Sequence, residues 1–260
     1  MLRLCIVGAS HVLALREGAP DLAAECQRRG IRLTFFANKL NAVTVADGLL
    51  APDPPLRSKL RARVLSKGGV PDVSLGDYDA FAVVGVGLFR TALQIYGQCR
   101  AESHDPGDGS QQLVSDRCFE TSLANTMRQT EHAHRFSLRL RAGTDVPIAL
   151  LPVPFYKESM ADSEEFGPRL IPMRDARAAQ ALADSYRRAM RRLAGDQFTV
   201  IDQAPETLAT PALTHDDFSV GKRETSEGIF DDPNHMNGTY GRIMLARCLD
   251  WAETVVKVPA

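Results

Sequence analysis

Residues 2–7 read LRLCIV, and the turn Gly8-Ala9-Ser10 follows them directly. A short apolar run that ends at a turn of small residues is typical of a buried β-strand. Residues 12–29 then show a helical pattern, which Gly30 ends. The chain therefore begins with a strand, a turn and a helix, as the first part of a β-α-β unit does.

The same alternation continues along the chain. The helical patterns cover roughly 112–142, 175–194 and 239–256. Strands that are apolar throughout are typical of a parallel sheet that helices cover on both faces. We therefore expect an α/β fold, a three-layer α/β/α sandwich with about five parallel strands. After the first strand, the expected strands are 31–37 (IRLTFFA), 80–86 (AFAVVGV), 146–153 (VPIALLPV) and 198–201 (FTVI).

Composition limits the possible partners. The chain has 260 residues, of which 44% are hydrophobic, so it can bury a full core and is not a disordered or small disulfide-stapled protein. Its 31 Lys plus Arg and 32 Asp plus Glu give a net charge of -1, which does not favour nucleic acid or an anionic membrane as a partner. No stretch approaches the roughly 18 apolar residues of a membrane-spanning helix.

The cysteines indicate a reducing compartment. The five residues lie far apart and form no C-x-x-C pair, which favours free thiols over disulfides or structural zinc. The N-terminal apolar run is shorter than the core of a signal peptide. We therefore expect a cytoplasmic protein. The cysteines are Cys5, Cys26, Cys99, Cys118 and Cys248.

The chain is expected to form one domain over residues 1–260. None of its irregular stretches has the composition of an interdomain linker, and loops this long in a compact domain are often functional. We expect them to build the walls of a substrate pocket. The principal ones are 38–56, 155–174 and 210–236, with a further one at 101–111.

Ser10 lies where an open parallel sheet usually binds its ligand, beyond the carboxyl end of a strand. Its own N–H and the start of the following helix favour negative charge there. A serine hydroxyl needs a base to become nucleophilic, and the base needs an acid to orient it. Asp232 and His235, three residues apart before the last helical pattern, supply both groups on one side of a turn.

These two blocks together resemble the SGNH (GDSL-like) hydrolase superfamily. The resemblance implies a flavodoxin-like sandwich of about five parallel strands that spans nearly the whole chain. It also implies that Ser10 is the nucleophile, His235 the general base and Asp232 its orienting carboxylate. The matching residues are Gly8-Ala9-Ser10-His11 at the start, and Asp232, His235, Asn237, Tyr240 and Gly241 near the end.

The sequence departs from the family pattern in its middle. After the third strand, where the family has Gly-x-Asn, the chain reads Gly85-Val86-Gly87-Leu88-Phe89. The oxyanion hole is therefore expected to use the N–H groups of Ser10, Gly87 and Gly48, with Asn41 as another donor and Leu88 as a possible substitute. The residues expected to bind substrate are His11, Asn41, Leu88 and Arg90.

Other sites are less favoured by the sequence. His132 and His134 are two residues apart on a predicted helix and so face different directions, which does not suit a metal. The acidic residues near the C-terminus lack the spacing of a calcium loop. The first turn has one of the three glycines of a dinucleotide fingerprint. We expect neither a metal nor a cofactor.

The predicted function is hydrolysis of a small acyl ester by a Ser-His-Asp triad, with an O-acylated carbohydrate among the candidate substrates. One alternative is an O-acyltransferase that uses a sugar or polysaccharide precursor as acceptor. Another is a binding protein that keeps the fold without efficient catalysis, which the absent Gly-x-Asn motif would favour. The expected partner is a small-molecule or glycan ester, and the sequence predicts no oligomeric state.

Overall fold

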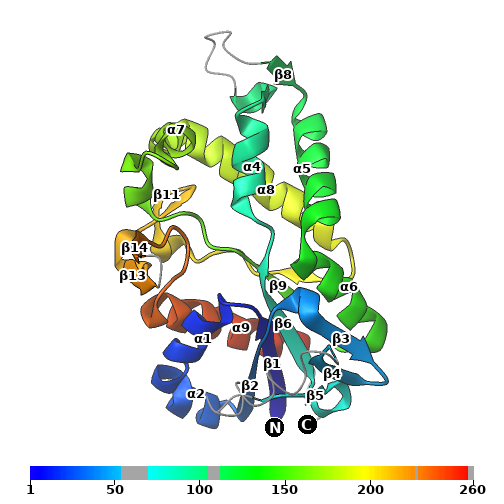
Figure 1. Ribbon diagram of the computed structural model, residues 1–260. Helices are drawn as coiled ribbons and strands as arrows, with labels where there is room; N and C mark the ends of the chain where they lie inside the picture. Colours follow the sequence, from blue (N-terminus) through cyan, green and yellow to red (C-terminus); the bar gives the residue numbers. More distant parts are fainter. Residues whose placement is uncertain (54–69, 105–111, 226–227, 257–260) are drawn as a thin grey trace.

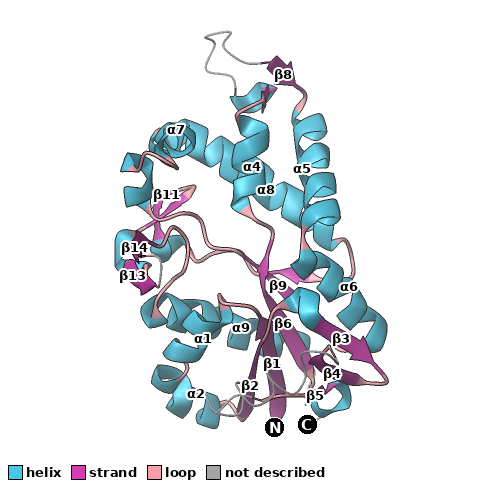
Figure 2. Ribbon diagram, in the orientation of Figure 1, coloured by secondary structure: helices cyan, strands magenta, loops and turns pink. Residues whose placement is uncertain are grey.

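A central sheet organises the molecule. The computed structural model describes residues 1–53, 70–104, 112–225 and 228–256. Its main sheet has five parallel strands in the order β10-β9-β6-β1-β2 (Figures 1 and 2). All five expected strands are present, so the α/β prediction is confirmed. Their bounds are β1 (Leu2–Gly8), β2 (Ile31–Ala37), β6 (Ala80–Val86), β9 (Ile148–Pro152) and β10 (Thr199–Val200).

Both faces of the sheet are buried. Successive side chains of a strand point to opposite faces. In β1, Cys5 and Val7 belong to one hydrophobic core, whereas Leu4 and Ile6 belong to the other. All four side chains are fully buried. This is why residues 4–7 of the strand are apolar at every position rather than at alternate ones.

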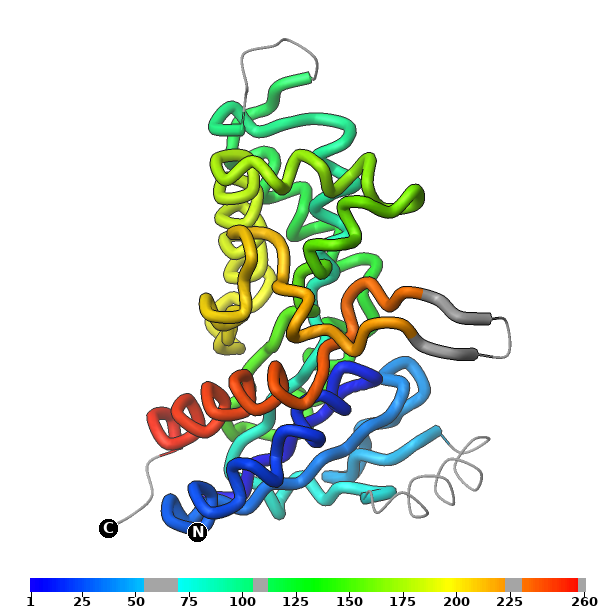
Figure 3. The backbone as a smooth tube through the Cα atoms, turned by 90° about the vertical axis from the view of Figure 1, so that its left-hand side faces the viewer, coloured from blue at the N-terminus to red at the C-terminus, as the bar shows by residue number. Residues whose placement is uncertain are grey.

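Helices α1 and α9 cover one face of the sheet, and Figure 3 shows them lying side by side. The first helix is shorter than the sequence pattern predicts. Pro20 begins a short 3-10 turn, and its missing N–H and fixed φ divide the predicted helix into two. The elements are α1 (Val12–Gly18), η1 (Pro20–Leu22), α2 (Ala23–Arg28) and α9 (Gly238–Val255).

The other core brings α6 and α8 against the opposite face. The predicted helix over 112–142 is two helices, α5 and α6, which break at Glu131. Helix α4 was not predicted, and with α5 it extends past the carboxyl ends of the strands (Figure 1). Within the described residues, no helix is long and apolar enough to cross a membrane. The helices are α4 (Phe89–Tyr96), α5 (Asp116–Thr130), α6 (His132–Gly143) and α8 (Ala176–Ala194).

The long stretches expected to be irregular contain short regular elements where the structure describes them. Residues 105–111 and 54–56 lie outside the described part of the chain. The elements after β2 are η2 (Leu40–Ala42), β3 (Val43–Ala46), β4 (Leu49–Pro52), β5 (Val73–Ser74) and η3 (Leu75–Asp77), and those around 101–111 are β7 (Cys99–Ala101), η4 (Glu102–His104) and β8 (Gln112–Val114). Those after β9 are η5 (Glu158–Asp162), α7 (Gly167–Leu170) and η6 (Ile171–Arg174). Those after β10 are η7 (Pro205–Thr207), β11 (Leu208–Thr210), β12 (Leu213–Thr214), η8 (Asp216–Phe218), β13 (Lys222–Thr225) and β14 (Gly228–Asp231).

The crossing of α1 and α9 depends on a glycine. A Cβ added to Gly241 would lie 1.8 Å from the carbonyl oxygen of Ala14, closer than any real contact allows. The backbones of the two helices therefore touch at this point. Because Ser10 precedes α1 and His235 precedes α9, this close approach also sets the distance between the two ends of the chain that carry them.

We predict that Gly241→Ala separates the two helices and lowers the free energy of unfolding by about 1–3 kcal/mol, as overpacking usually does. Chemical denaturation followed by circular dichroism measures the change. Gly76→Ala is the matched control, because a Cβ at Gly76 meets nothing within 4 Å. Equal stability of Gly241→Ala and wild type would show that the helices do not need this contact.

Candidate active site

Ser10 lies in the tight turn between β1 and α1, and it is exposed. The N–H of Leu13 donates to the Ser10 carbonyl oxygen over 3.1 Å and so starts the helix. Among the described residues, the N–H of Ser10 has no hydrogen-bond acceptor. The hydroxyl and this N–H are therefore both available to a ligand at the carboxyl end of β1.

The structure brings Ser10, His235 and Asp232 together as the sequence predicted. The Ser10 Oγ atom lies 2.6 Å from Nε2 of His235, although the two residues are 225 positions apart in the chain. On the other side of the ring, Nδ1 lies 2.9 Å from Oδ1 of Asp232. The carboxylate thus holds one imidazole nitrogen while the other nitrogen faces the hydroxyl, which is the arrangement that activates a serine.

Asp232 is held as an anion by its neighbours. Its side chain is almost completely buried, with 1% of the residue exposed. The burial by itself raises the pKa of the Asp232 carboxyl, but hydrogen bonds from the backbone and ring of His235 outweigh it, so the pKa is lowered overall. The N–H groups of His235 and Asn234 donate to Oδ1 over 2.9 and 3.3 Å. At neutral pH the carboxylate is therefore charged and can stabilise an imidazolium.

The loop that carries His235 has further fixed contacts. The imidazole of His11 stacks on that of His235, with ring centroids 4.6 Å apart and planes 12° from parallel. Asn237 caps α9, because its Oδ1 accepts a hydrogen bond from the N–H of Tyr240 over 3.1 Å. Its Nδ2 donates to the carbonyl oxygens of Asp217 and Ser219. The residues around the predicted base therefore orient it.

A cavity of about 280 Å³ opens beside the Ser10 turn. Three of the residues expected to bind substrate line it, namely His11, Asn41 and Leu88, whereas Arg90 is exposed in the first turn of α4 and is not among its lining residues. The volume suits a small ligand, because drug-sized ligands usually occupy about 300 Å³ or more. The other lining residues are Ala9, Lys39, Leu40, Val84, Gly85, Thr130, Glu131, His132 and Ala133.

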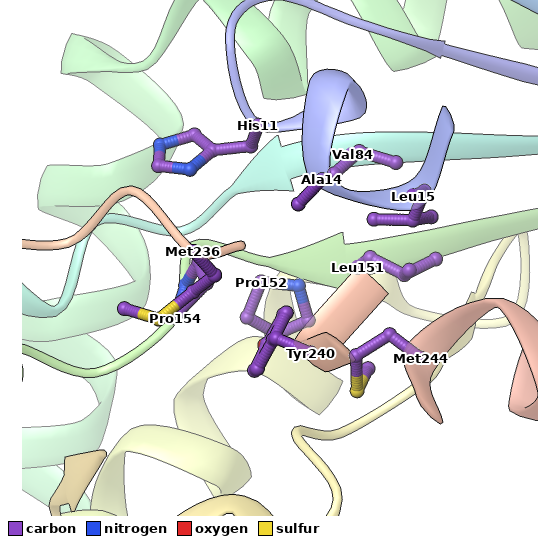
Figure 4. A pocket seen from close by; sticks show the side chains of 10 residues that line it. All are labelled: His11, Ala14, Leu15, Val84, Leu151, Pro152, Pro154, Met236, Tyr240 and Met244. Carbon is purple, nitrogen blue, oxygen red and sulfur yellow. The ribbon is translucent and has the colours of Figure 1, made fainter. Parts of the chain in front are cut away.

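A second cavity lies on the α1 and α9 side of the sheet, and Figure 4 shows the mainly apolar side chains around it. His11 borders this cavity as well as the larger one. The volume of this second cavity is only about 10 Å³, near the lower limit for a single water molecule. It has no room for an acyl group, so the cavity of about 280 Å³ is the better candidate of these two for a substrate pocket.

The structure corrects the expected role of Gly87. Its N–H donates to Oε2 of Glu131 over 2.5 Å, and the N–H of Leu88 donates to Oε1 over 2.6 Å. The carbonyl oxygen of Gly87 accepts a hydrogen bond from the hydroxyl of Tyr186. The φ of Gly87 is 77°, a backbone conformation that favours glycine, and an added Cβ would lie 2.2 Å from Sδ of Met190. This peptide is thus held by Glu131 and Tyr186, and its N–H is not free for an oxyanion.

Gly48 is also misplaced by the sequence interpretation. It lies in the turn between β3 and β4, and its carbonyl oxygen accepts a hydrogen bond from the N–H of Leu75 over 2.7 Å. Leu75 precedes β6 and therefore lies near the amino ends of the parallel strands, whereas Ser10 lies at their carboxyl ends. Gly48 and Ser10 therefore lie at opposite ends of the parallel strands, so Gly48 does not contribute to this site.

Asn41, unlike Gly48, lines the cavity beside the Ser10 turn. It belongs to η2, directly after β2, and its side chain makes no hydrogen bond to any other described residue. The turn around it is fixed, because the N–H of Ala42 donates to the carbonyl oxygen of Lys39 over 2.8 Å and Arg139 donates to that of Leu40 over 3.1 Å. Asn41 thus presents a free amide at the edge of the cavity from an anchored turn.

Glu131 is the residue that the sequence analysis missed. Only 4% of it is exposed, and among the described residues it has no cationic partner. Burial raises the pKa of the Glu131 carboxyl, and the N–H groups of Leu88 and Gly87 oppose the shift. The signal in the sequence is slight, since Glu131 is one acidic residue within a helical pattern that otherwise continues across it.

The described residues include no group of three His, Cys, Asp or Glu side chains arranged to hold a metal ion. No protein-family model matches the chain, and no curated protein matches it significantly. The function must therefore be inferred from the geometry of the site.

We predict that Glu131→Gln destabilises the loop after β6, because an amide oxygen can accept one of the two N–H groups and its NH₂ opposes the other. The expected loss is about 1–3 kcal/mol of unfolding free energy at neutral pH. The pKa of Glu131 is raised in the folded state, so its ionisation disfavours folding as pH rises through that pKa. The advantage of wild type over the variant should therefore change with pH.

Denaturant titrations between about pH 4 and pH 8 test this. The titration of Glu131 by itself makes wild-type stability decline across this range, and Glu131→Gln should lack this decline. Glu164→Gln, at an exposed position after η5, is the control for a carboxylate that is not buried. Identical pH profiles for wild type and Glu131→Gln would contradict the prediction.

Proposed function

We propose that the protein is a serine-dependent ester hydrolase of the SGNH type that acts on a small acyl ester. The observation that carries the proposal is the continuous hydrogen-bonded series from Asp232 through His235 to Ser10. Read from the other edge, the parallel strands have the order β2-β1-β6-β9-β10, which is 2-1-3-4-5 when these five strands are numbered along the chain. This order, with Ser10 at the carboxyl end of β1, supports the proposed family. A flavodoxin-like sheet has this order.

The proposed reaction has two half-reactions, and His235 transfers protons in both of them. Ser10 Oγ attacks the ester carbonyl carbon while His235 Nε2 takes its proton, and Asp232 stabilises the resulting imidazolium. The tetrahedral intermediate collapses, the ester C–O bond breaks, and His235 returns the proton to the leaving alcohol. Water then attacks the acyl-enzyme, His235 takes a proton from it, and the carboxylic acid leaves as Ser10 regains its hydrogen.

The negative charge on the carbonyl oxygen needs donors in fixed positions. The free N–H of Ser10 supplies one of them in the proposal. Asn41 supplies the second, because its side chain lines the cavity that opens beside the Ser10 turn, next to Ala9 and His11, and makes no other hydrogen bond to the described residues. The amides of Gly87 and Leu88 take no part, since Glu131 occupies both.

We predict that wild type turns over 4-nitrophenyl acetate and that Ser10→Ala loses about 10³-fold or more of the rate, as removal of a nucleophile does. A fluorophosphonate probe should label Ser10 in wild type and react far more slowly with His235→Ala. Mass spectrometry of the labelled peptide checks the position. Ser122→Ala is the serine control, because Ser122 is exposed on α5 and is not part of the triad or of the loop that carries His235.

The same experiment distinguishes the hydrolase from the second candidate function, a binding protein of the same fold. The occupied amides of Gly87 and Leu88 favour a binding protein of this fold without efficient turnover. Equal rates for wild type and Ser10→Ala, together with absent labelling, would replace the hydrolase by that binding protein.

A separate prediction concerns Asn41. Removing one oxyanion donor usually costs a factor of about 10²–10³ in kcat, so Asn41→Ala should lower kcat by that amount with little change in KM. Lys39→Met is the control, because Lys39 lines the same cavity two residues before Asn41. A loss confined to Lys39→Met would identify the lysine, rather than Asn41, as the donor.

A further inference from the structure

Lys157 is a buried lysine next to the catalytic loop. Only 4% of it is exposed, and its ammonium forms an ion pair with Asp231, the residue before Asp232. Lysine is almost never buried without a charged partner, because removing an ammonium from water is costly. Asp231 by contrast keeps 40% of its side chain exposed. The position of the ammonium thus depends on Asp231.

The backbone of Lys157 makes a second contact with the same loop. Its N–H donates to the carbonyl oxygen of Pro233 over 3.0 Å. Asp231 and Pro233 are the residues on either side of Asp232. One residue therefore holds the chain before and after the carboxylate that orients His235.

The segment that contains Lys157 is anchored to the interior. Phe155 and Tyr156 are buried, and the N–H of Phe155 donates to Oε1 of Gln203 over 2.9 Å. The N–H of Thr214 donates to the carbonyl oxygen of Tyr156 over 2.8 Å. The segment follows β9 of the central sheet. Lys157 therefore connects the loop of Asp232 and His235 to the rigid part of the fold.

The opposite side of the loop has a different kind of neighbour. The N–H of Val220 donates to the carbonyl oxygen of His235 over 3.1 Å, and the N–H of Asp232 donates to that of Gly221 over 3.2 Å. These residues lead into β13 and β14, which among the described residues form a separate two-stranded ribbon. That contact joins the loop to a small ribbon, whereas Lys157 joins it to the sheet.

We propose that Lys157 is a positioning residue that fixes Asp232 and His235 relative to Ser10. The proposal rests on the hydrolase function proposed above. Lys157 acts through the backbone on both sides of Asp232 and does not touch the substrate. Its effect is therefore expected in kcat, through the fraction of molecules with a correctly oriented His235, and not in substrate binding.

The ion pair predicts an asymmetry between its two partners. Lys157→Met removes the buried charge and leaves Asp231 free to be solvated. Asp231→Asn leaves the ammonium buried without its counter-ion, which is the more costly change. Asp231→Asn should therefore lower the melting temperature more than Lys157→Met does, and the double variant should recover part of the loss.

The functional test compares Lys157→Met with Lys222→Met. Lys222 is exposed and lies directly opposite Asp231 in the β13 and β14 ribbon, so it is a lysine near the same carboxylate that does not anchor the loop. With 4-nitrophenyl acetate, Lys157→Met should lose about tenfold or more in kcat with KM within about twofold of wild type. Lys222→Met should retain wild-type kinetics.

A spectroscopic measurement tests positioning without relying on turnover. The proton between His235 Nδ1 and Asp232 should give a far-downfield proton resonance, which Asp232→Asn identifies by its loss. Lys157→Met should broaden or abolish this resonance through exchange with water, and Lys222→Met should preserve it. Circular dichroism checks that each variant is folded.

The outcomes separate the two proposals. An intact resonance in folded Lys157→Met, or equal kinetic losses in the two lysine variants, would overturn the positioning role. Equal turnover by wild type and Ser10→Ala would instead refute the hydrolase, and the resonance would still decide whether Lys157 positions the His235 and Asp232 pair.

Discussion

The structure depends on the close approach of α1 and α9 against one face of the sheet. Gly241 lets the backbone of α9 touch that of α1 at Ala14. Because a closely packed interior is hardly compressible, this contact fixes the distance between the two helices. Ser10 precedes α1 and His235 precedes α9, so the crossing brings together two groups that lie 225 positions apart. The distance of 2.6 Å between Ser10 and His235 is a consequence of helix packing as much as of the loops that hold them.

Two buried carboxylates show how the environment separates structural and chemical roles. Asp232 and Glu131 each accept two backbone N–H groups and are almost fully buried. For Asp232 the hydrogen bonds from His235 outweigh burial and lower its pKa, whereas for Glu131 burial prevails and raises its pKa. Asp232 faces an imidazole that can gain a proton. Glu131 instead holds the peptides after β6, which restricts the donors available near Ser10.

The loop after β14 receives its geometry from three directions. Asn237 caps α9 on one side, the backbone of Val220 and Gly221 lies on another, and Lys157 holds the residues around Asp232 from the interior. A catalytic group must be fixed within a fraction of an ångström to be effective, and surrounding hydrogen bonds usually provide this precision. The long segment after β9 thus has a structural connection to the site, in addition to forming part of the outer surface.

The sequence by itself determined the strands of the central sheet and the three residues of the candidate triad. Strands buried on both faces are mainly apolar along their length, and Ser10, Asp232 and His235 stand next to recognisable turns, so both signals are local. Only the tertiary structure decided the donors around Ser10. A glycine is a suitable residue type at both positions. However, Gly48 lies at the opposite end of the parallel strands from Ser10, and the N–H of Gly87 is held by Glu131. The contacts of Glu131 with Gly87 and of Lys157 with Asp231 join residues 44 and 74 positions apart. Local patterns do not encode such pairings, because they arise from the packing of whole elements against one another.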